Sequence, residues 1–85
     1  MSALKELVEF VVQSMVDHPQ EVAVTEVGYG AEVTMELSVA EGDMGRVIGS
    51  RGRTINSIRT IVQVLAVKQG KRATLELLEP EAKGN

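Results

Sequence analysis

The sequence predicts an α+β fold, a two-layer sandwich in which a three-stranded sheet carries helices on one face. In some segments apolar residues recur every three or four positions, as in amphipathic helices, and in others they alternate with polar residues, as in half-buried strands. The expected order is helix, strand, strand, short helix, helix, strand. A chain of 85 residues is sized for one such domain, which we place at residues 1–80, followed by a flexible tail at residues 81–85.

The first half of the chain predicts one helix and two strands. Residues 3–16 carry an apolar stripe at helical spacing, and Ser2 is a suitable N-cap. Residues 21–28 are rich in β-branched side chains, and the glycines at 28–30 indicate a turn. Residues 32–39 alternate between apolar and polar, so one side of this strand is expected to face the core and the other to face water.

The second half of the chain predicts two helices and a last strand. Asp43 is placed to cap a short helical turn over residues 44–48. A long helix is expected over residues 53–68, with Gly70 ending it, and residues 72–79 form the third strand. Five apolar residues of the long helix share one face at helical periodicity: Ile55, Ile58, Val62, Leu65 and Ala66.

Charge is distributed unevenly along the chain, although the net charge is only −3 at pH 7. Residues 1–43 hold nine acidic side chains and one basic one, whereas residues 44–72 hold seven basic side chains and no acidic one. Residues 73–85 hold three acidic side chains and one basic one. An anionic ligand responds to the local potential more than to the net charge, so the basic segment at 44–72 is the expected contact surface for a polyanion.

The basic segment contains the sequence Gly-Ser-Arg-Gly at residues 49–52, and the second glycine stands where the long helix begins. A helix start offers unpaired backbone N–H groups and the positive end of the helix dipole, and glycine lets a phosphate approach the backbone closely. Arg46, Arg51 and Arg53 surround this sequence with donors suited to phosphate oxygens. Two glycines at this spacing are also typical of a plain turn between helices, with the arginines as solvated surface residues.

The sequence GRVIGSRGRTINSIRTI at residues 45–61 resembles the core signature of a KH domain, in which Val-Ile-Gly-x-x-Gly joins two helices. The predicted order of elements is similar to that of the type II, prokaryotic KH domain. With no accessory domain, the chain resembles most the KhpA family of small stand-alone bacterial KH proteins, over nearly its whole length. The resemblance implies a cytoplasmic RNA-binding protein that clamps about four nucleotides of single-stranded RNA. It also implies an RNA chaperone or post-transcriptional regulator linked to cell elongation or division, acting with a second KH-containing protein, KhpB.

The resemblance also implies which residues bind RNA. The clamp would consist of the four loop residues, Gly49, Ser50, Arg51 and Gly52. Ile48 and Ile55 would support the clamp and line one wall of a groove for the bases, and residues 33–37 would form the other wall. Arg46 and Arg53 would make further phosphate contacts. The first variable position of the loop often carries a lysine in this family; here it is a serine, which leaves the contact geometry open, although neither variable position is acidic.

The composition gives little support to an enzyme. The chain has no cysteine, and its one histidine, His18, is interpreted as a helix cap or a surface residue, so neither a zinc site nor a catalytic triad is expected. The lysine-containing phosphate loop of nucleotide-binding enzymes is absent. No apolar run approaches the roughly 20 residues that a membrane helix needs. We therefore expect no metal, no cofactor, no catalytic residue and no membrane attachment; an enzyme of unrecognised type is the weakest alternative.

The long helix also carries apolar residues outside its core face. Ile61 and Val64, followed by Val67, turn away from the buried stripe. Ile61 could flank a broad core stripe, with the two valines as scattered surface residues. Alternatively, Ile61 and Val64 could form a face for a homodimer or for a heteromer with a KhpB-like partner. The second function hypothesis is accordingly an interaction module with a KH fold, in which RNA binding is secondary.

Overall fold

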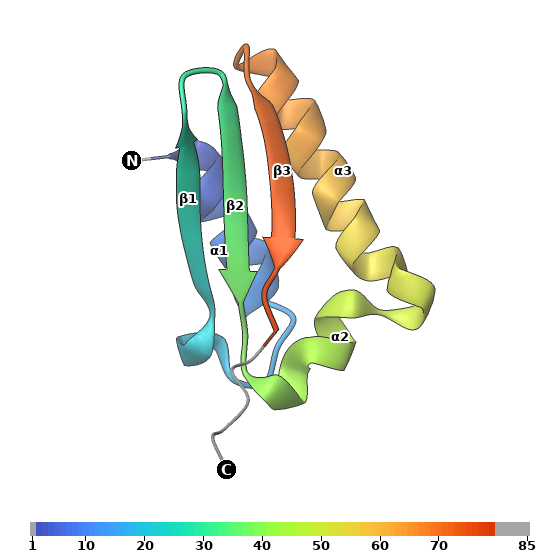
Figure 1. Ribbon diagram of the computed structural model, residues 1–85. Coiled ribbons are helices and arrows are strands. Elements are labelled where there is room, and N and C mark those ends of the chain that lie inside the picture. Colours follow the sequence, from blue (N-terminus) through green and yellow to red (C-terminus); the bar gives the residue numbers. More distant parts are fainter. Residues whose placement is uncertain (1, 80–85) are drawn as a thin grey trace.

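The computed structural model of the protein describes residues 2–79, and the predicted tail at 81–85 lies outside the described residues. The elements follow the predicted order (Figure 1). The helices and strands are α1 (Ala3–Gln13), β1 (Ala23–Tyr29), β2 (Glu32–Ser38), α2 (Met44–Ile48), α3 (Arg53–Lys68) and β3 (Arg72–Leu77). Short 3₁₀ turns at Pro19–Glu21, Glu41–Asp43 and Ser50–Gly52 connect them.

The three strands form one mixed sheet in the order β1-β2-β3. The hairpin of β1 and β2 is antiparallel, whereas β2 and β3 run parallel because α2 and α3 carry the chain back between them. In Figure 1, α1 lies behind the sheet and α3 runs beside β3, so the helices share one layer and the opposite face of the sheet is open. The predicted two-layer α+β sandwich is therefore confirmed.

The core lies between the sheet and the two longer helices. The alternation predicted for β2 is confirmed, because Val33, Met35 and Leu37 are all buried. The core face predicted for α3 is also buried, apart from Leu65, which packs against the core and is partly exposed. From α1 the buried residues are Leu4, Val8 and Val12. Ser2 caps α1 as predicted, since its side chain accepts a hydrogen bond from the Lys5 N–H at 3.2 Å.

The end of α3 also follows the prediction. Gly70 has a φ of 75°, in the left-handed region, and its N–H donates to the Val67 carbonyl at 2.9 Å. The N–H of Lys71 then donates to the Ala66 carbonyl at 2.8 Å. This pair of bonds is the Schellman motif, which ends a helix by satisfying two of its last carbonyls. It turns the chain directly into β3.

Several boundaries differ from the prediction. Strand β1 begins at Ala23 rather than at residue 21, β2 ends at Ser38 rather than at residue 39, and β3 ends at Leu77 rather than at residue 79. Helix α1 ends at Gln13 rather than at residue 16, because the chain leaves the helix to bring the backbone of Asp17 and His18 to a distant carboxylate. Strand β1 continues through Tyr29, so the hairpin turn lies at residues 30–31. A side chain at position 28 would collide with the carbonyl across the hairpin, and the φ of 138° there also requires glycine.

Candidate nucleic-acid interface

The Gly-Ser-Arg-Gly sequence forms an exposed loop between α2 and α3, at the end of α3 opposite the β1–β2 hairpin (Figure 1). Gly49 has φ 76° and ψ 176°, a conformation that is essentially restricted to glycine. A Cβ at this position would also collide with the side chain of Thr54. Gly49 is therefore required on two grounds, conformation and space.

The two other left-handed residues of the loop are Arg51, with φ 57°, and Gly52, with φ 74°. Within residues 2–79, Arg51 is the one residue other than glycine with a positive φ. A Cβ at Gly52 would meet only the Asn56 amide at 3.8 Å, so the space in front of this glycine is open. Three of the four loop residues, Gly49, Arg51 and Gly52, thus have non-helical conformations and form the kink that separates α2 from α3.

The first turn of α3 has no side-chain cap. Gly52 is its N-cap residue and has no side chain to accept a bond from the helix N–H groups. These donors and the positive end of the helix dipole are directed toward the loop, where Ser50 and Arg51 are both exposed. The loop therefore combines backbone donors, a guanidinium group and a backbone surface that a phosphate can reach.

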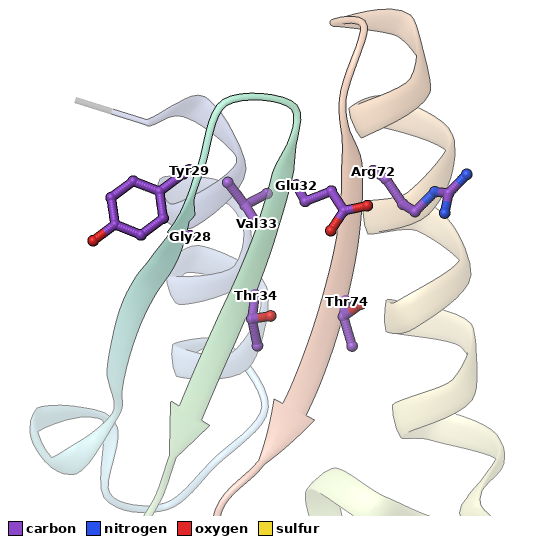
Figure 2. Close-up of a pocket in the computed structure, with 7 residues that line it drawn as sticks. All are labelled: Gly28, Tyr29, Glu32, Val33, Thr34, Arg72 and Thr74. Atoms are coloured by element: carbon purple, nitrogen blue, oxygen red, sulfur yellow. The ribbon is translucent and has the colours of Figure 1, made fainter.

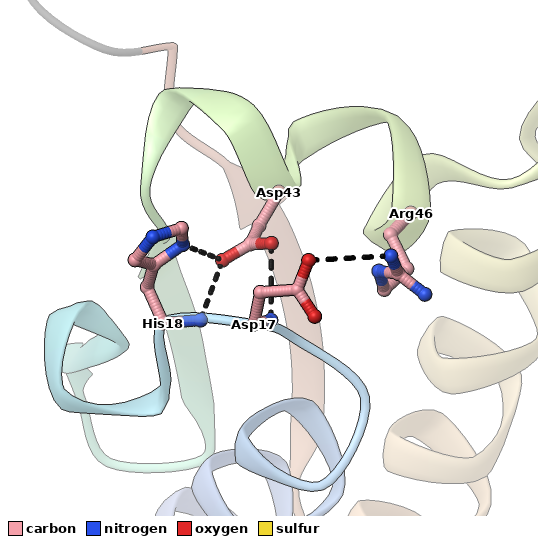
Figure 3. A network of polar contacts seen from close by, with 4 residues as sticks. All are labelled: Asp17, His18, Asp43 and Arg46. Carbon is pink, nitrogen blue, oxygen red and sulfur yellow. Dashed lines mark hydrogen bonds and ion pairs between the residues drawn. The ribbon is translucent and has the colours of Figure 1, made fainter.

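The other predicted arginines lie on either side of the loop. Arg53, in the first turn of α3, is exposed. Arg46, in α2, pairs with Asp17, with 3.4 Å between Nη2 and Oδ2 (Figure 3). Their side chains are 55% and 69% exposed, and an ion pair so open to solvent is weak. A phosphate could therefore take the place of Asp17 on Arg46 at little cost.

The two isoleucines differ in exposure. Ile48, the last residue of α2, is half-buried, and Ile55 is buried beneath the first turn of α3. Ile55 thus holds the start of α3 against the core, whereas Ile48 keeps part of its surface beside the loop. The predicted site residues in α2, the loop and α3 are continuous in the sequence and remain together in the structure.

The prediction that residues 33–37 form the second wall of the groove is wrong. Strand β2 is the central strand, with its backbone paired on both sides and its inward side chains Val33, Met35 and Leu37 buried. The strand beside α3 is β3 (Figure 1). The prediction failed because alternation shows which strand is half-buried but not which strand lies at the edge of the sheet.

Arg59 joins α3 to the edge of β3. Its Nε donates to the Leu75 carbonyl at 3.1 Å, and its Nη1 donates to the Asn56 Oδ1 at 2.7 Å. In a parallel pair of strands, alternate residues direct both backbone groups to the same side, and this bond shows that the Leu75 carbonyl points outward from the edge, where Arg59 occupies it. Sequence reasoning missed this contact; the only signal was an arginine within the acid-free segment.

Asp43 forms a second contact that sequence reasoning missed (Figure 3). Its side chain is 2% exposed, and the carboxylate accepts hydrogen bonds from the backbone N–H of Asp17 at 3.1 Å and of His18 at 3.0 Å. The His18 Nδ1 lies 3.2 Å from the same carboxylate. The expected side-chain cap of α2 by Asp43 is thus wrong: Asp43 holds the N-cap position but its side chain turns to the connection after α1. His18 does not cap α1, whose C-cap is Ser14; it is a surface residue, the other interpretation, with a side chain that is 50% exposed.

The pKa of Asp43 reflects two opposing effects. Burial raises the pKa of this carboxyl, because a charge loses its hydration. The hydrogen bonds from Asp17 and His18, together with the charge of His18, outweigh burial and hold the pKa below its usual value. Asp43 is therefore a carboxylate at neutral pH, and it ties the start of α2 to the chain between α1 and β1.

Neither a metal site nor a membrane span is found in the part of the chain that the structure describes. Within residues 2–79, no three His, Cys, Asp or Glu side chains gather in a way that could hold a metal ion. No helix in that range combines the length and the apolar character needed to cross a membrane.

The order of elements and the glycine loop between α2 and α3 define a type II KH domain. The chain belongs to the KhpA/KhpB KH-domain family, whose model matches residues 5–77. It is 44% identical over 75 residues to RNA-binding protein KhpA of Clostridium acetobutylicum, covering 88% of this chain and 100% of the relative. It is 43% identical over 79 residues to RNA-binding protein KhpA of Aquifex aeolicus, covering 93% of this chain and 100% of the relative.

A solved structure has a similar fold. The crystal structure of Aquifex aeolicus Era bound to GDP and AlF4⁻ superposes with a TM-score of 0.63 and 20% sequence identity. The match covers 89% of this chain but only 29% of the Era chain, so the likeness concerns one part of Era. At this identity it shows the fold alone. The named relatives are RNA-binding proteins rather than enzymes, and the family is not an enzyme family.

Proposed function

We propose that the protein binds single-stranded RNA, with the loop at residues 49–52 clamping its phosphate backbone. The observation that carries the proposal is the exposed glycine loop at the uncapped start of α3, within a chain segment that has no acidic residue. Membership of a family whose relatives are named RNA-binding protein supports RNA as the polyanion. Arg46, Arg51 and Arg53 supply the counter-charge.

Beside the clamp, the groove for the bases has one wall at Ile48 and the first turns of α3, supported by Ile55 from beneath. We propose the β3 edge as the other wall, in place of residues 33–37. The Leu75 carbonyl at this edge is held by Arg59. Phe10 and Tyr29 are the only aromatic residues, and both lie outside the 44–72 segment, so the groove relies on aliphatic contacts and hydrogen bonds rather than stacking.

We also propose that the protein works in the cytoplasm as an RNA chaperone or post-transcriptional regulator linked to cell elongation or division. A KhpB-like KH protein is the proposed partner. This part of the proposal is supported by the family alone, whose model covers KhpA and KhpB together.

Salt dependence provides the test of a phosphate clamp. Each phosphate neutralised on a single strand contributes about −0.7 to the slope of log affinity against log salt. Three arginine contacts predict a slope of about −2, so affinity for an RNA of about four nucleotides should fall about 20-fold between about 50 and 200 mM salt. NMR titration of the loop amides would measure this. An affinity that does not change with salt would contradict the clamp.

A second function, self-association through α3, is favoured by three exposed apolar side chains on one helix. Ile61, Val64 and Val67 are 53%, 63% and 71% exposed. Their spacing places them side by side on the helix, away from the core face. Two clamps held in one dimer would raise the affinity for a long RNA without any new contact.

Charge substitution tests this surface. We expect the Ile61→Asp/Val64→Asp variant to sediment as a monomer at concentrations where the wild-type protein forms dimers, because a dimer interface would bury two carboxylates from each chain. Gln63→Asp/Gln69→Asp provides the control, since it adds the same charge at exposed polar positions on the same helix and its C-cap. An unchanged sedimentation profile for the Ile61→Asp/Val64→Asp variant would exclude this face as the dimer interface.

A further inference from the structure

The basic residues of the 44–72 segment separate into two groups in the structure. Arg46, Arg51 and Arg53 lie at the clamp, whereas Lys68, Lys71 and Arg72 lie at the turn between α3 and β3. This turn and the β1–β2 hairpin are at the same end of the molecule, at the top of Figure 1, and the clamp is at the opposite end of α3. The backbones of the two turns also meet, because the Arg72 N–H donates to the Ala31 carbonyl at 2.7 Å.

We name this end of the molecule the hairpin-end patch and define it by Tyr29, Lys68, Lys71 and Arg72. Among residues 2–79, the ion pairs found are His18–Asp43 and Arg46–Asp17, so the three cations of the patch have no carboxylate within 4.0 Å in that range. Lys68 and Arg72 are exposed and Lys71 is half-buried. The folded domain leaves these charges without a partner, whereas Arg59, between the two basic groups, is bound to β3.

The patch borders two hollows in the surface. One, of about 450 Å³, is lined by residues of all three strands: Tyr29 and Arg72 stand on its two sides, with Glu32, Thr34 and Thr74 between them (Figure 2). The other, of about 420 Å³, lies between the two turns and is lined in part by Lys71 and Arg72. Arg72 thus borders both hollows.

The open face of the sheet supplies further groups to the first hollow. Tyr29 is 94% exposed, and Thr34 and Thr74 face each other across β2 and β3 with their hydroxyl groups on the open face (Figure 2). Glu32 lies directly opposite Arg72 in register and lines both hollows, and the two side chains form no ion pair. An aromatic ring, hydroxyl groups and an unpaired guanidinium are the groups that bind a base and a phosphate of a single strand.

Helix α3 connects the two basic groups without an acidic residue. Positions 53, 57, 60, 64 and 68 share one face of the helix, which begins with an arginine and ends with a lysine. Sixteen residues span about 24 Å. The clamp holds about four nucleotides, so an RNA of that length is bound entirely at the loop. Only a longer strand can also reach the other end of α3.

We propose that the hairpin-end patch is a second binding site for the backbone of single-stranded RNA, reached by strands that extend beyond the clamp. This inference rests on the proposed function and adds a length requirement to it. Phosphates contact Lys68, Lys71 and Arg72, and Tyr29 offers its ring to an adjacent base. The site recognises phosphate and an unstacked base rather than a particular sequence.

The test compares the Lys68→Gln/Arg72→Gln variant with the wild-type protein on two RNAs of mixed sequence, about four and about sixteen nucleotides long. We expect the variant to bind the long RNA about tenfold more weakly, with a salt slope reduced by about 1.4, since two phosphate contacts are lost. Its affinity for the short RNA should stay within about twofold of wild type. Titrations are run below the dimerisation concentration, because self-association would cover the middle of α3.

Gln20→Glu/Ala23→Glu is the matched control, because it makes the same change in net charge at exposed positions around the start of β1, the strand farthest from α3. It should bind the long RNA like the wild-type protein.

Tyr29 is the only tyrosine, so its ring proton resonances report on the patch and should shift with the long RNA but not with the short one. Equal binding of the long RNA by the variant and the wild-type protein would overturn this inference while leaving the clamp intact. Absence of any binding of either RNA by the wild-type protein would overturn the proposed function and this inference together.

Discussion

Replacing Ser50 and Arg51 together with aspartate should reduce RNA affinity at least 100-fold while leaving the domain folded. The two substitutions change the charge of the loop by three units, at positions that are exposed and adjacent to the start of α3. Two carboxylates there would repel the phosphates that the helix start otherwise attracts. Fluorescence anisotropy with a labelled RNA measures the loss.

The loop backbone accommodates this change. Arg51 has a φ of 57°, and aspartate is among the residues that enter the left-handed region most readily. Carboxylates near a helix N-terminus also interact favourably with the helix dipole. The melting temperature should therefore stay within a few degrees of wild type, and an unfolded variant would contradict this account of the loop.

Ser50→Asn/Arg51→Asn is the matched control. Asparagine tolerates the same backbone conformation but carries no charge, so this variant removes the guanidinium without adding repulsion. We expect it to lose about tenfold in affinity, between the wild-type protein and the aspartate variant. Full RNA binding by the aspartate variant would exclude the clamp, and the α3 face would then become the leading functional surface.

Asp43→Asn should lower the melting temperature by about 10 °C, the largest stability effect that we expect from a single polar substitution. The carboxylate accepts bonds from two backbone N–H groups and faces the His18 ring. An amide of the same shape has one accepting oxygen, and its NH₂ group would point at a donor. At least one N–H in these part-buried bonds would then lack its partner, which costs more than the loss of an exposed bond. Thermal unfolding followed by circular dichroism measures the change.

The pH dependence gives an independent check on Asp43. The pKa of Asp43 is lowered in the folded protein. The stabilisation that ionised Asp43 gives the fold is therefore fully present above its pKa in the unfolded chain, about 3.9, and is lost as the pH falls through its pKa in the folded protein. The stability difference between the wild-type protein and Asp43→Asn should therefore shrink below about pH 4.

His18→Ala separates the contacts of Asp43. This variant removes the ring but keeps both backbone donors, so we expect a smaller loss of stability than for Asp43→Asn. Equal melting temperatures of the wild-type protein and Asp43→Asn at neutral pH would show that the contacts of Asp43 with Asp17 and His18 do not hold α2 to the rest of the fold.

Much of this protein could be predicted from the sequence, because the signals are local. Helical spacing and alternation depend on residues within a few positions of each other, and they identified the six helices and strands found within residues 2–79 and the buried side of β2 and α3. That the residues of the proposed clamp lie together was also predictable, because residues 46–55 are consecutive and Gly49 has a conformation that other residues do not adopt easily. Charge along the chain indicated which segment a polyanion would meet.

Only the tertiary structure decided which distant residues meet. Asp43 and the backbone of residues 17–18 are 25 or 26 positions apart, and no local pattern shows that a carboxylate will leave its own helix to bind them. The position of β3 beside α3, the contact of Arg59 with its edge and the division of the basic segment into two ends likewise follow from packing. The sequence by itself determined the elements, the loop and the charge, since these depend on neighbouring residues. The sheet order and the long-range contacts depend on how those elements bury their apolar faces together, and this is settled only when the chain folds.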